Sequence, residues 1–245
     1  MNNNETFSLI KERVKSEQKI RILAFGSSNT ERILPGMHWF DVFDLAIGNT
    51  FGRVHCCINT GIGGNTSKDL LDRFEDDAVF YKPHMAFITV GGNDSNPDRN
   101  LSEDQFKANL MELFNRFNKM DCKVVYQTYY APIHELCPDA HMEKFYRYME
   151  IIRQTAKETG SGLIDHLVRW EYLRKYHPKK HLPLMQDGMH VNRRGNMVMG
   201  LDISRHFDVK ANIPYANSVH DTDGRGFWDE AVEIQKLMDS NSSQG

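Results

Sequence analysis

Two short segments, far apart in the sequence, carry side chains that could together form an acyl-transfer site. The first contains Ser28, in Phe-Gly-Ser-Ser-Asn-Thr at residues 25–30, directly after an apolar run. The second is Asp-Gly-Met-His at residues 187–190. A serine hydroxyl becomes a good nucleophile when a histidine takes its proton, and a carboxylate orients that histidine. The alternatives are a helix-capping serine and a structural pairing of Asp187 with His190.

Two further loops offer groups that could stabilise negative charge. Residues 59–67 include three glycines in four positions, which allows a backbone amide to approach a ligand closely. Asn93, in Gly-Gly-Asn-Asp, ends another apolar run and presents a neutral amide donor of the kind that suits an oxyanion. A flexible glycine turn and a turn asparagine are the structural alternatives.

The same residue types give little support for a metal or cofactor. Asp-x-x-His has no second ligand pair at helical spacing, and Pro178 and Pro183 are expected to break any helix joining His177 to His181. No Cys-x-x-Cys motif is present, so we predict neither a metal site nor a cofactor. Reduced, buried thiols are expected for the four cysteines, Cys56, Cys57, Cys122 and Cys137.

The elements that must position these residues alternate between strands and helices. Short apolar runs predict strands at residues 21–25, 53–58, 85–90, 123–128 and 162–165. Helical patterns lie between and after them, at residues 38–47, 66–81, 102–120, 142–159 and 193–207. This alternation predicts an α/β fold with a parallel sheet covered on both faces. In such sheets the site lies beyond the carboxyl ends of the strands, where the polar loops fall.

The ends of the chain differ from this pattern. We expect a helical lead-in over residues 1–20, the α/β domain that carries the polar loops over 21–209 and a C-terminal arm over 210–245. Within that arm, residues 210–225 read as extended, 226–238 as a short helix and 239–245 as frayed. Phe227 and Trp228 could pack on the same domain or on a partner subunit, so a homo-oligomer stays possible.

Composition excludes several classes of protein. Over 245 residues, 40% are hydrophobic and 26% charged, as in ordinary globular proteins. The net charge of -3 argues against a nucleic-acid partner. No apolar stretch approaches the length of a membrane helix, and residues 1–20 do not read as a signal peptide, so we expect a cytoplasmic protein with no membrane partner.

Four blocks in order resemble the SGNH (GDSL-type) hydrolase family: Phe-Gly-x-Ser-Asn-Thr, Asn-x-Gly-x-x-Gly-x-Thr, Gly-Gly-Asn-Asp and Asp-x-x-His. The resemblance implies a three-layer, flavodoxin-like α/β/α sandwich with five parallel strands. It matches the family's nucleophile to Ser28, its oxyanion donors to the Ser28 and Gly64 amides and the Asn93 side chain, and its acid–base pair to Asp187 and His190.

One departure lies beside the nucleophile. The family usually has aspartate in the position that Ser27 occupies here. The carboxylate that orients the histidine is instead the one in Asp-x-x-His, so catalysis need not be lost. We favour Ser28 over Ser27 as the nucleophile because Asn29 and Thr30 follow it as in the family pattern.

The sequence indicates the substrate less clearly than it indicates the reaction. Trp39, shortly after the nucleophile turn, could stack on a sugar ring, and the alternative for this residue is a position in the core. Asn29 is a second candidate for contact with the substrate. The hydrophilic composition argues against a lipase, and the loop spacing resembles that of carbohydrate acetyl esterases in the family. We therefore expect hydrolysis of short acyl esters, chiefly acetyl, on a small molecule or oligosaccharide. The alternatives are a thioesterase or lysophospholipase, a binding protein with impaired catalysis, and a protein-interaction module.

Overall fold

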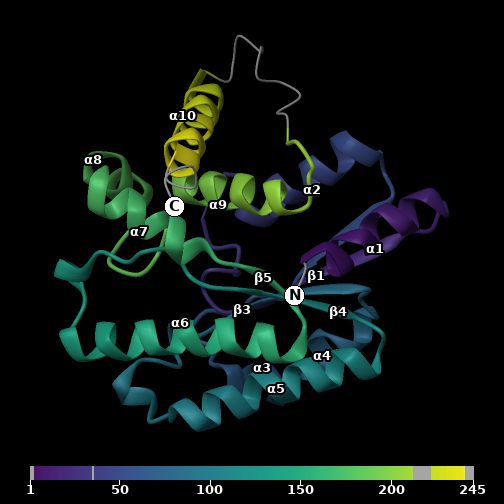
Figure 1. Ribbon diagram of the computed structural model, residues 1–245, viewed down its shortest axis with the longest axis horizontal. Helices are drawn as coiled ribbons and strands as arrows, with labels where there is room; N and C mark the ends of the chain where they lie inside the picture. The colour runs from purple at the N-terminus through teal and green to yellow at the C-terminus, as the bar shows by residue number, and fades with distance from the viewer. Residues whose placement is uncertain (1–2, 35, 212–221, 241–245) are drawn as a thin grey trace. The chain divides into compact units, whose positions relative to one another are not determined.

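The computed structural model describes residues 3–34, 36–211 and 222–240. The chain divides into two compact units. The first comprises residues 1–33, 54–129 and 134–165, and the second comprises residues 34–53, 130–133 and 166–245. Helices and strands are labelled in Figure 1.

A five-stranded parallel sheet forms the centre of the first unit. Its strands lie in the order β2-β1-β3-β4-β5, which is the flavodoxin-like order. The predicted α/β fold with a five-stranded parallel sheet is therefore confirmed. The strands are β1 (Ile20–Gly26), β2 (His55–Asn59), β3 (Met85–Thr89), β4 (Lys123–Gln127) and β5 (Gly162–Ile164).

Strand order determines where polar loops can meet. Every residue of β3 is buried, as expected for a parallel strand that reads as an unbroken apolar run. The chain turns outward in opposite directions after β1 and β3, because β2 lies on one side of β1 and β4 on the far side of β3. Gly26 pairs with Thr89, so these two central strands end at the same level. Ser27 and Ser28 follow at this switch point, where α/β sheets bind ligands.

The helices of the first unit pack against the sheet and against one another. α5 and α6 lie side by side in Figure 1 and both contact β4. α5 buries the predicted apolar stripe, including Phe106, Leu110 and Phe117. Helices of this unit are α1 (Asn3–Lys15), α3 (Ser67–Asp72), α4 (Phe74–Asp77), α5 (Glu103–Lys119) and α6 (Asp139–Thr159).

The prediction of a single helix over residues 66–81 is wrong. The structure has α3, α4 and a 3-10 turn, Val79–Tyr81, instead. The break between α3 and α4 falls at Arg73, whose backbone leaves helical geometry with φ -98° and ψ 13°. The Arg73 side chain reaches back to the strand ends, as described below, so tertiary contacts override the local helical pattern.

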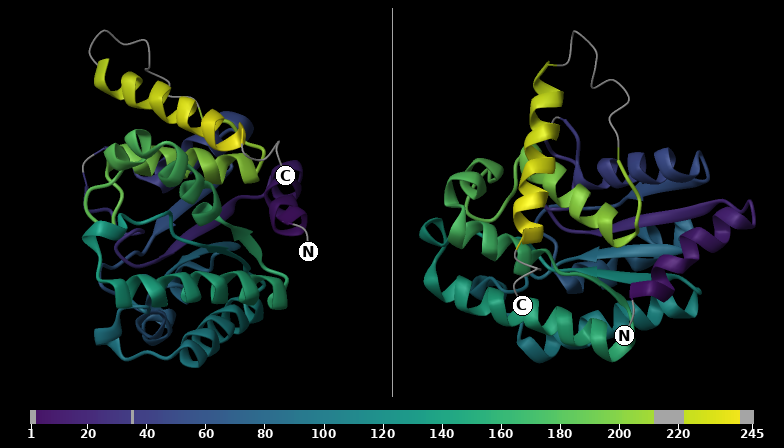
Figure 2. Two further views of the ribbon diagram at one scale, coloured as in Figure 1. Left: turned by 60° about the vertical axis from the view of Figure 1, so that its left-hand side comes forward. Right: turned by 45° about the horizontal axis from the view of Figure 1, so that its top comes forward.

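The second unit is helical. α9 (Arg193–His206) packs against α2 (Trp39–Phe51) and against α10 (Thr222–Asp239). Figure 2 shows α10 lying across α9. The close approach of α2 to α9 depends on Gly200, since a Cβ there would lie 2.7 Å from the Trp39 carbonyl oxygen.

Two helices of this unit were not predicted from the sequence. α7 (His166–Tyr176) is anchored by His166, whose Nδ1 lies 2.7 Å from the Asp202 carboxylate, and by Arg169, which bonds the same carboxylate. α8 (Pro178–His181) forms although Pro178 was expected to prevent it. Proline is compatible with the first position of a helix, and that is where Pro178 lies.

Expectations for the chain ends and the thiols also need correction. α10 begins at Thr222, so residues 222–225 are helical rather than extended, while residues 212–221 and 241–245 lie outside the described residues. All four cysteines are free, as expected, but Cys122 alone is buried and Cys56 is exposed. The described helices include none with the length and apolarity that a membrane crossing requires.

Candidate active site

The turn after β1 separates the two neighbouring serines. Ser27 is fully buried, and its hydroxyl oxygen lies 2.9 Å from the Tyr129 hydroxyl. Its carbonyl accepts hydrogen bonds from the amides of Thr30 and Glu31, each at 2.9 Å, which closes the turn. Ser28 is partly exposed. A nucleophile must be reachable by substrate, so the geometry favours Ser28 over Ser27.

The glycine-rich loop runs alongside Ser28. A Cβ built on Gly63 would lie 3.9 Å from the Ser28 Cβ, and the Gly63 amide donates to the Glu31 carboxylate at 2.9 Å. Gly64 has φ +78°, a left-handed conformation that favours glycine. Among the described residues, the Gly64 amide has no hydrogen-bond acceptor. This loop can therefore present a backbone donor close to Ser28.

Asn93 is held at the end of β3 by its neighbours. Its side-chain amide donates to the Asn65 carbonyl at 2.9 Å, which uses one of two hydrogens. The adjacent Asp94 is fully buried and accepts from the Ser67 amide at 2.7 Å and the Gly91 amide at 3.0 Å. Burial raises the pKa of the Asp94 carboxyl, and these hydrogen bonds oppose that effect. Asp94 thus fixes the loop that carries Asn93.

Arg73 joins the turn after β1 to the glycine-rich loop, and sequence reasoning missed it. Its guanidinium donates to the Gly26 carbonyl at 3.0 Å, the Thr60 carbonyl at 2.7 Å and the Asn65 side chain at 2.8 Å. The guanidinium also lies 4.5 Å from the centre of the Phe25 ring. An arginine within a helical pattern reads as a surface residue, so no sequence signal marks this role.

Tyr129 is a second residue that the sequence analysis missed. Besides bonding Ser27, its ring packs on Gly92, where a Cβ would lie 2.5 Å from a ring carbon. Burial raises the pKa of the Tyr129 hydroxyl, so the hydroxyl stays protonated near neutrality. Asn29 also hydrogen-bonds Tyr129 and is only 6% exposed.

Asp187 and His190 meet within one tight turn of the second unit, as the spacing predicts. The imidazole Nδ1 lies 2.9 Å from an Asp187 carboxylate oxygen. The other oxygen accepts from the backbone amides of Met189 and His190, each at 2.8 Å. Partial burial raises the pKa of Asp187, but the hydrogen bonds from Met189 and His190 outweigh it, so the pKa is lowered overall. The carboxylate therefore stays ionised beside the imidazole.

The turn itself is clamped by groups that sequence reasoning did not single out. The Tyr130 hydroxyl donates to the Met189 carbonyl at 2.8 Å and accepts from the Val191 amide at 2.9 Å. The Asn192 side chain donates to the Pro183 carbonyl at 2.8 Å and accepts from the Arg194 amide, capping α9. The pair is thus held from both sides by neutral hydrogen bonds.

Trp39 does not lie where a sugar could stack on it. Its side chain is fully buried, its backbone amide donates to Asn196 at 3.3 Å, and its ring lies 5.2 Å from that of Phe40. The core position, which was the alternative for this residue, is therefore the one observed. An indole has a large hydrophobic surface, and the packing of α2 inside the second unit buries that of Trp39.

The structure thus gathers the predicted residues in two groups. Ser28, Gly64 and Asn93 follow the ends of β1, β2 and β3 in the first unit. Asp187 and His190 lie together in the second unit, before α9.

Two known proteins are similar to this chain in sequence. An acetylxylan esterase of Geobacillus stearothermophilus is 26% identical over 152 residues, which cover 58% of this chain and 67% of that protein. The uncharacterized lipoprotein YqeF of Bacillus subtilis (strain 168) is 29% identical over 138 residues, and the match covers 52% of this chain and 55% of the lipoprotein.

Solved structures share the fold. The acetylxylan esterase Axe2 of Geobacillus stearothermophilus has a TM-score of 0.68 at 22% identity, covering 80% of this chain and 98% of that one. The acetyl xylan esterase AlAXEase has a TM-score of 0.65 at 25% identity, covering 75% of this chain and 98% of that one. Solved catalytic mutants of Axe2 replace a serine, and an aspartate and a histidine three positions apart.

A family model settles the relationship. The GDSL-like lipase/acylhydrolase family matches residues 24–198, which span every motif described above. The chain therefore belongs to the GDSL-like lipase/acylhydrolase family and is a carboxylic ester hydrolase.

Proposed function

We propose that this chain is a serine esterase that removes short acyl groups, chiefly acetyl, from a carbohydrate. The observation that carries the proposal is the surroundings of Ser28. A Cβ built on Gly63 would lie 3.9 Å from the Ser28 Cβ, and Asn93 is tied to the same loop through Asn65. Relatives named acetylxylan esterases support both the acetyl group and the carbohydrate.

The reaction assigns one role to each residue. Ser28 attacks the ester carbonyl while His190 takes the hydroxyl proton, and Asp187 orients the imidazole and stabilises its charged form. The carbonyl oxygen becomes an oxyanion, which accepts hydrogen bonds from the Ser28 and Gly64 amides and from the Asn93 side chain. The acyl C–O bond to the sugar then breaks, and His190 gives its proton to the departing sugar oxygen, which leaves as a hydroxyl.

Water completes the cycle. The first step leaves an acetyl group on the Ser28 oxygen. His190 then takes a proton from water, the resulting hydroxide attacks the acyl-enzyme, and the same oxyanion donors act a second time. Acetate leaves, and the proton returns to Ser28. Fixed neutral donors suit both steps because they need no reorganisation as charge develops.

A substrate panel tests the proposal. Acetylated xylo-oligosaccharides and p-nitrophenyl esters of increasing acyl length are given to the wild type and to Ser28→Ala. We expect acetyl esters to be cleaved best and Ser28→Ala to be inactive. Preference for thioesters or lysophospholipids would replace the carbohydrate assignment with the thioesterase or lysophospholipase alternative. Sugar binding without turnover would indicate a binding protein with impaired catalysis.

A further inference from the structure

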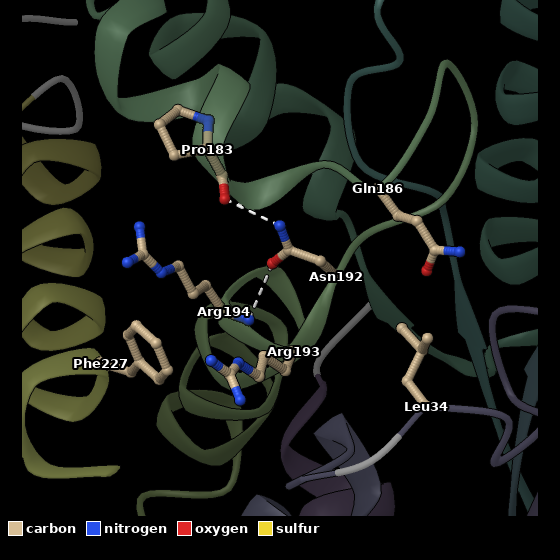
Figure 3. A pocket seen from close by; sticks show the side chains of 7 residues that line it. All are labelled: Leu34, Pro183, Gln186, Asn192, Arg193, Arg194 and Phe227. Carbon is tan, nitrogen blue, oxygen red and sulfur yellow. Dashed lines mark hydrogen bonds between the residues drawn. The ribbon is translucent and has the colours of Figure 1, made fainter. Parts of the chain in front are cut away.

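A cavity of about 490 Å³ lies within the second unit, beside the turn that carries Asp187 and His190. Its volume is within the range of about 300–1,000 Å³ that small-molecule sites occupy. Figure 3 shows two arginines and a phenylalanine at one end, and a glutamine and a leucine at the other. The lining residues are Leu34, Pro183, Gln186, Asn192, Arg193, Arg194 and Phe227.

Two guanidinium groups share one aromatic ring at this cavity. The central carbon of Arg193 lies 4.5 Å from the Phe227 ring centre, and that of Arg194 lies 4.4 Å from it. Two positive charges gathered at one ring favour a bound anion beside them. The guanidinium fork also matches a carboxylate, to which it can donate two parallel hydrogen bonds.

The positive charge at the cavity is only partly neutralised. Arg194 has an ion-pair partner, Glu230, at 3.6 Å. Across the described part of the chain, no carboxylate lies within ion-pair distance of Arg193, which is exposed. Arg193 is thus the cation that remains available to a ligand.

The rest of the wall suits a sugar ring rather than a bare anion. Leu34 and Pro183 supply apolar surface, and Gln186 supplies an amide that can both donate and accept. A largely apolar wall with a few polar groups is typical of small-molecule sites. Asn192 is already used in the clamp on Pro183 and α9.

The cavity is also coupled to the acid–base turn through the chain. Gln186 immediately precedes Asp187, and its backbone amide donates to the His190 carbonyl at 2.7 Å. Asn192 lies two residues beyond His190 and lines the same cavity. When the ester of one sugar unit of a glycan lies at His190, the next sugar unit can therefore reach this cavity.

We propose that this cavity is a subsite for a uronic acid residue of the glycan, with Arg193 binding the sugar carboxylate. The proposal rests on the proposed function and narrows its substrate to acetylated glycans that carry acidic sugars. Arg194 supports the charge, and Phe227 holds both guanidinium groups in place.

Two acetylated xylo-oligosaccharides of equal length, one neutral and one bearing a single glucuronic acid, test the subsite. We expect the wild type to prefer the acidic substrate by about tenfold or more in kcat/KM, the scale of a charge-assisted hydrogen bond. The preference should lie in KM and shrink as salt screens the charges. Arg193→Gln should bring the ratio close to one. Arg205→Gln removes the same charge from the other end of α9 and should keep the preference.

Equal kcat/KM for the two substrates in the wild type would overturn the subsite, as would equal loss of preference in Arg193→Gln and Arg205→Gln. Failure of the proposed function looks different, since neither p-nitrophenyl acetate nor any acetylated sugar would then be hydrolysed. Calorimetric binding of the deacetylated acidic oligosaccharide covers that case. Tighter binding to the wild type than to Arg193→Gln supports the subsite, and equal binding or none overturns it.

Discussion

The hydroxyl oxygens of Ser27 and Tyr129 lie 2.9 Å apart in the interior of the first unit. Ser27 occupies the position where GDSL-type relatives usually carry aspartate, and here it is fully buried. Because the Tyr129 ring also packs on Gly92, this hydrogen bond ties the turn that carries Ser28 to the loop that carries Asn93. Ser27 therefore has a structural partner, and Ser28 is left as the accessible serine.

Replacing each serine by alanine should separate these roles. Ser28→Ala is expected to lose about 10⁶-fold in turnover, as nucleophile removal does in subtilisin. Ser27→Ala should keep most of its activity but lose about 1 kcal/mol in the free energy of unfolding, because a buried hydrogen bond is broken. Ester hydrolysis and urea unfolding measure the two effects. An inactive but folded Ser27→Ala, with Ser28→Ala active, would reverse the assignment.

Removing the Asn93 side chain should slow the reaction without weakening substrate binding. One oxyanion donor is worth about 10²–10³-fold in turnover, so Asn93→Ala should lose that much in kcat with little change in KM. Asn118→Ala is a matched control, since Asn118 lies exposed on α5. Unchanged kcat in a folded Asn93→Ala protein would exclude Asn93 from the oxyanion site.

Asp187→Asn tests whether the pair with His190 is catalytic. The equivalent change in a serine protease costs about 10⁴-fold in turnover. Half of the Asp187 side chain is exposed, so water can partly replace it and a smaller loss is expected here. Because the pKa of Asp187 is lowered, its carboxylate stays charged, and the acid decline in rate should come from protonation of the base.

A pH profile of kcat/KM for the wild type and Asp187→Asn provides the measurement. The wild-type rate should decline as the pH falls, because a protonated base cannot take the proton of Ser28. A rate that stays constant down to pH about 5, or full activity in Asp187→Asn, would place the base elsewhere.

Arg73 should behave as a positioning residue. Arg73→Lys keeps the charge but cannot reproduce the donor fork that reaches the carbonyl oxygens of Gly26 and Thr60 and the Asn65 side chain. We expect kcat to fall by about 10–100-fold with a smaller change in KM, because displacement of catalytic groups acts mainly on the transition state.

The control for Arg73 is Arg116→Lys. Arg116 also bonds a backbone carbonyl, that of Leu71, and lies over an aromatic ring, but it contacts none of the strand-end loops. Both variants should lose some stability to urea. Equal kcat in the two would mean that Arg73 is merely structural.

The difference between predicted and missed residues has a physical origin. Ser28 and Asn93 could be predicted because each follows a buried parallel strand, and strand ends in such a sheet meet at one edge. Asp187 and His190 could be predicted because a three-residue spacing closes within a single turn. Arg73, Tyr129 and Tyr130 act through contacts with residues distant in the sequence, which no local pattern reveals. The same applies to Trp39, whose burial depends on α9 packing against α2.

His84 should make the stability of the first unit depend on pH. Its Nδ1 accepts the Arg21 backbone amide at 2.9 Å, which requires that nitrogen to be unprotonated. Burial, with the positive charges of Arg13 and Arg21, lowers the pKa of His84 to about 4. Unfolded histidine takes up a proton near pH about 6.5, so between these values the unfolded chain binds more protons than the folded one. Stability is therefore lost as pH falls from neutrality towards 4.

The measurement is urea unfolding at pH 7 and pH 4.5, for the wild type and for His84→Asn. The asparagine carbonyl can replace Nδ1 as acceptor but cannot be protonated in this range. After allowing for the partial exposure of His84, the wild type should lose about 1–2 kcal/mol more than the variant between the two pH values. His206, whose pKa burial also lowers to about 4, titrates in both proteins and so cancels from the difference. Equal pH dependence in the two proteins would mean that His84 can be protonated without loss of its hydrogen bond to Arg21.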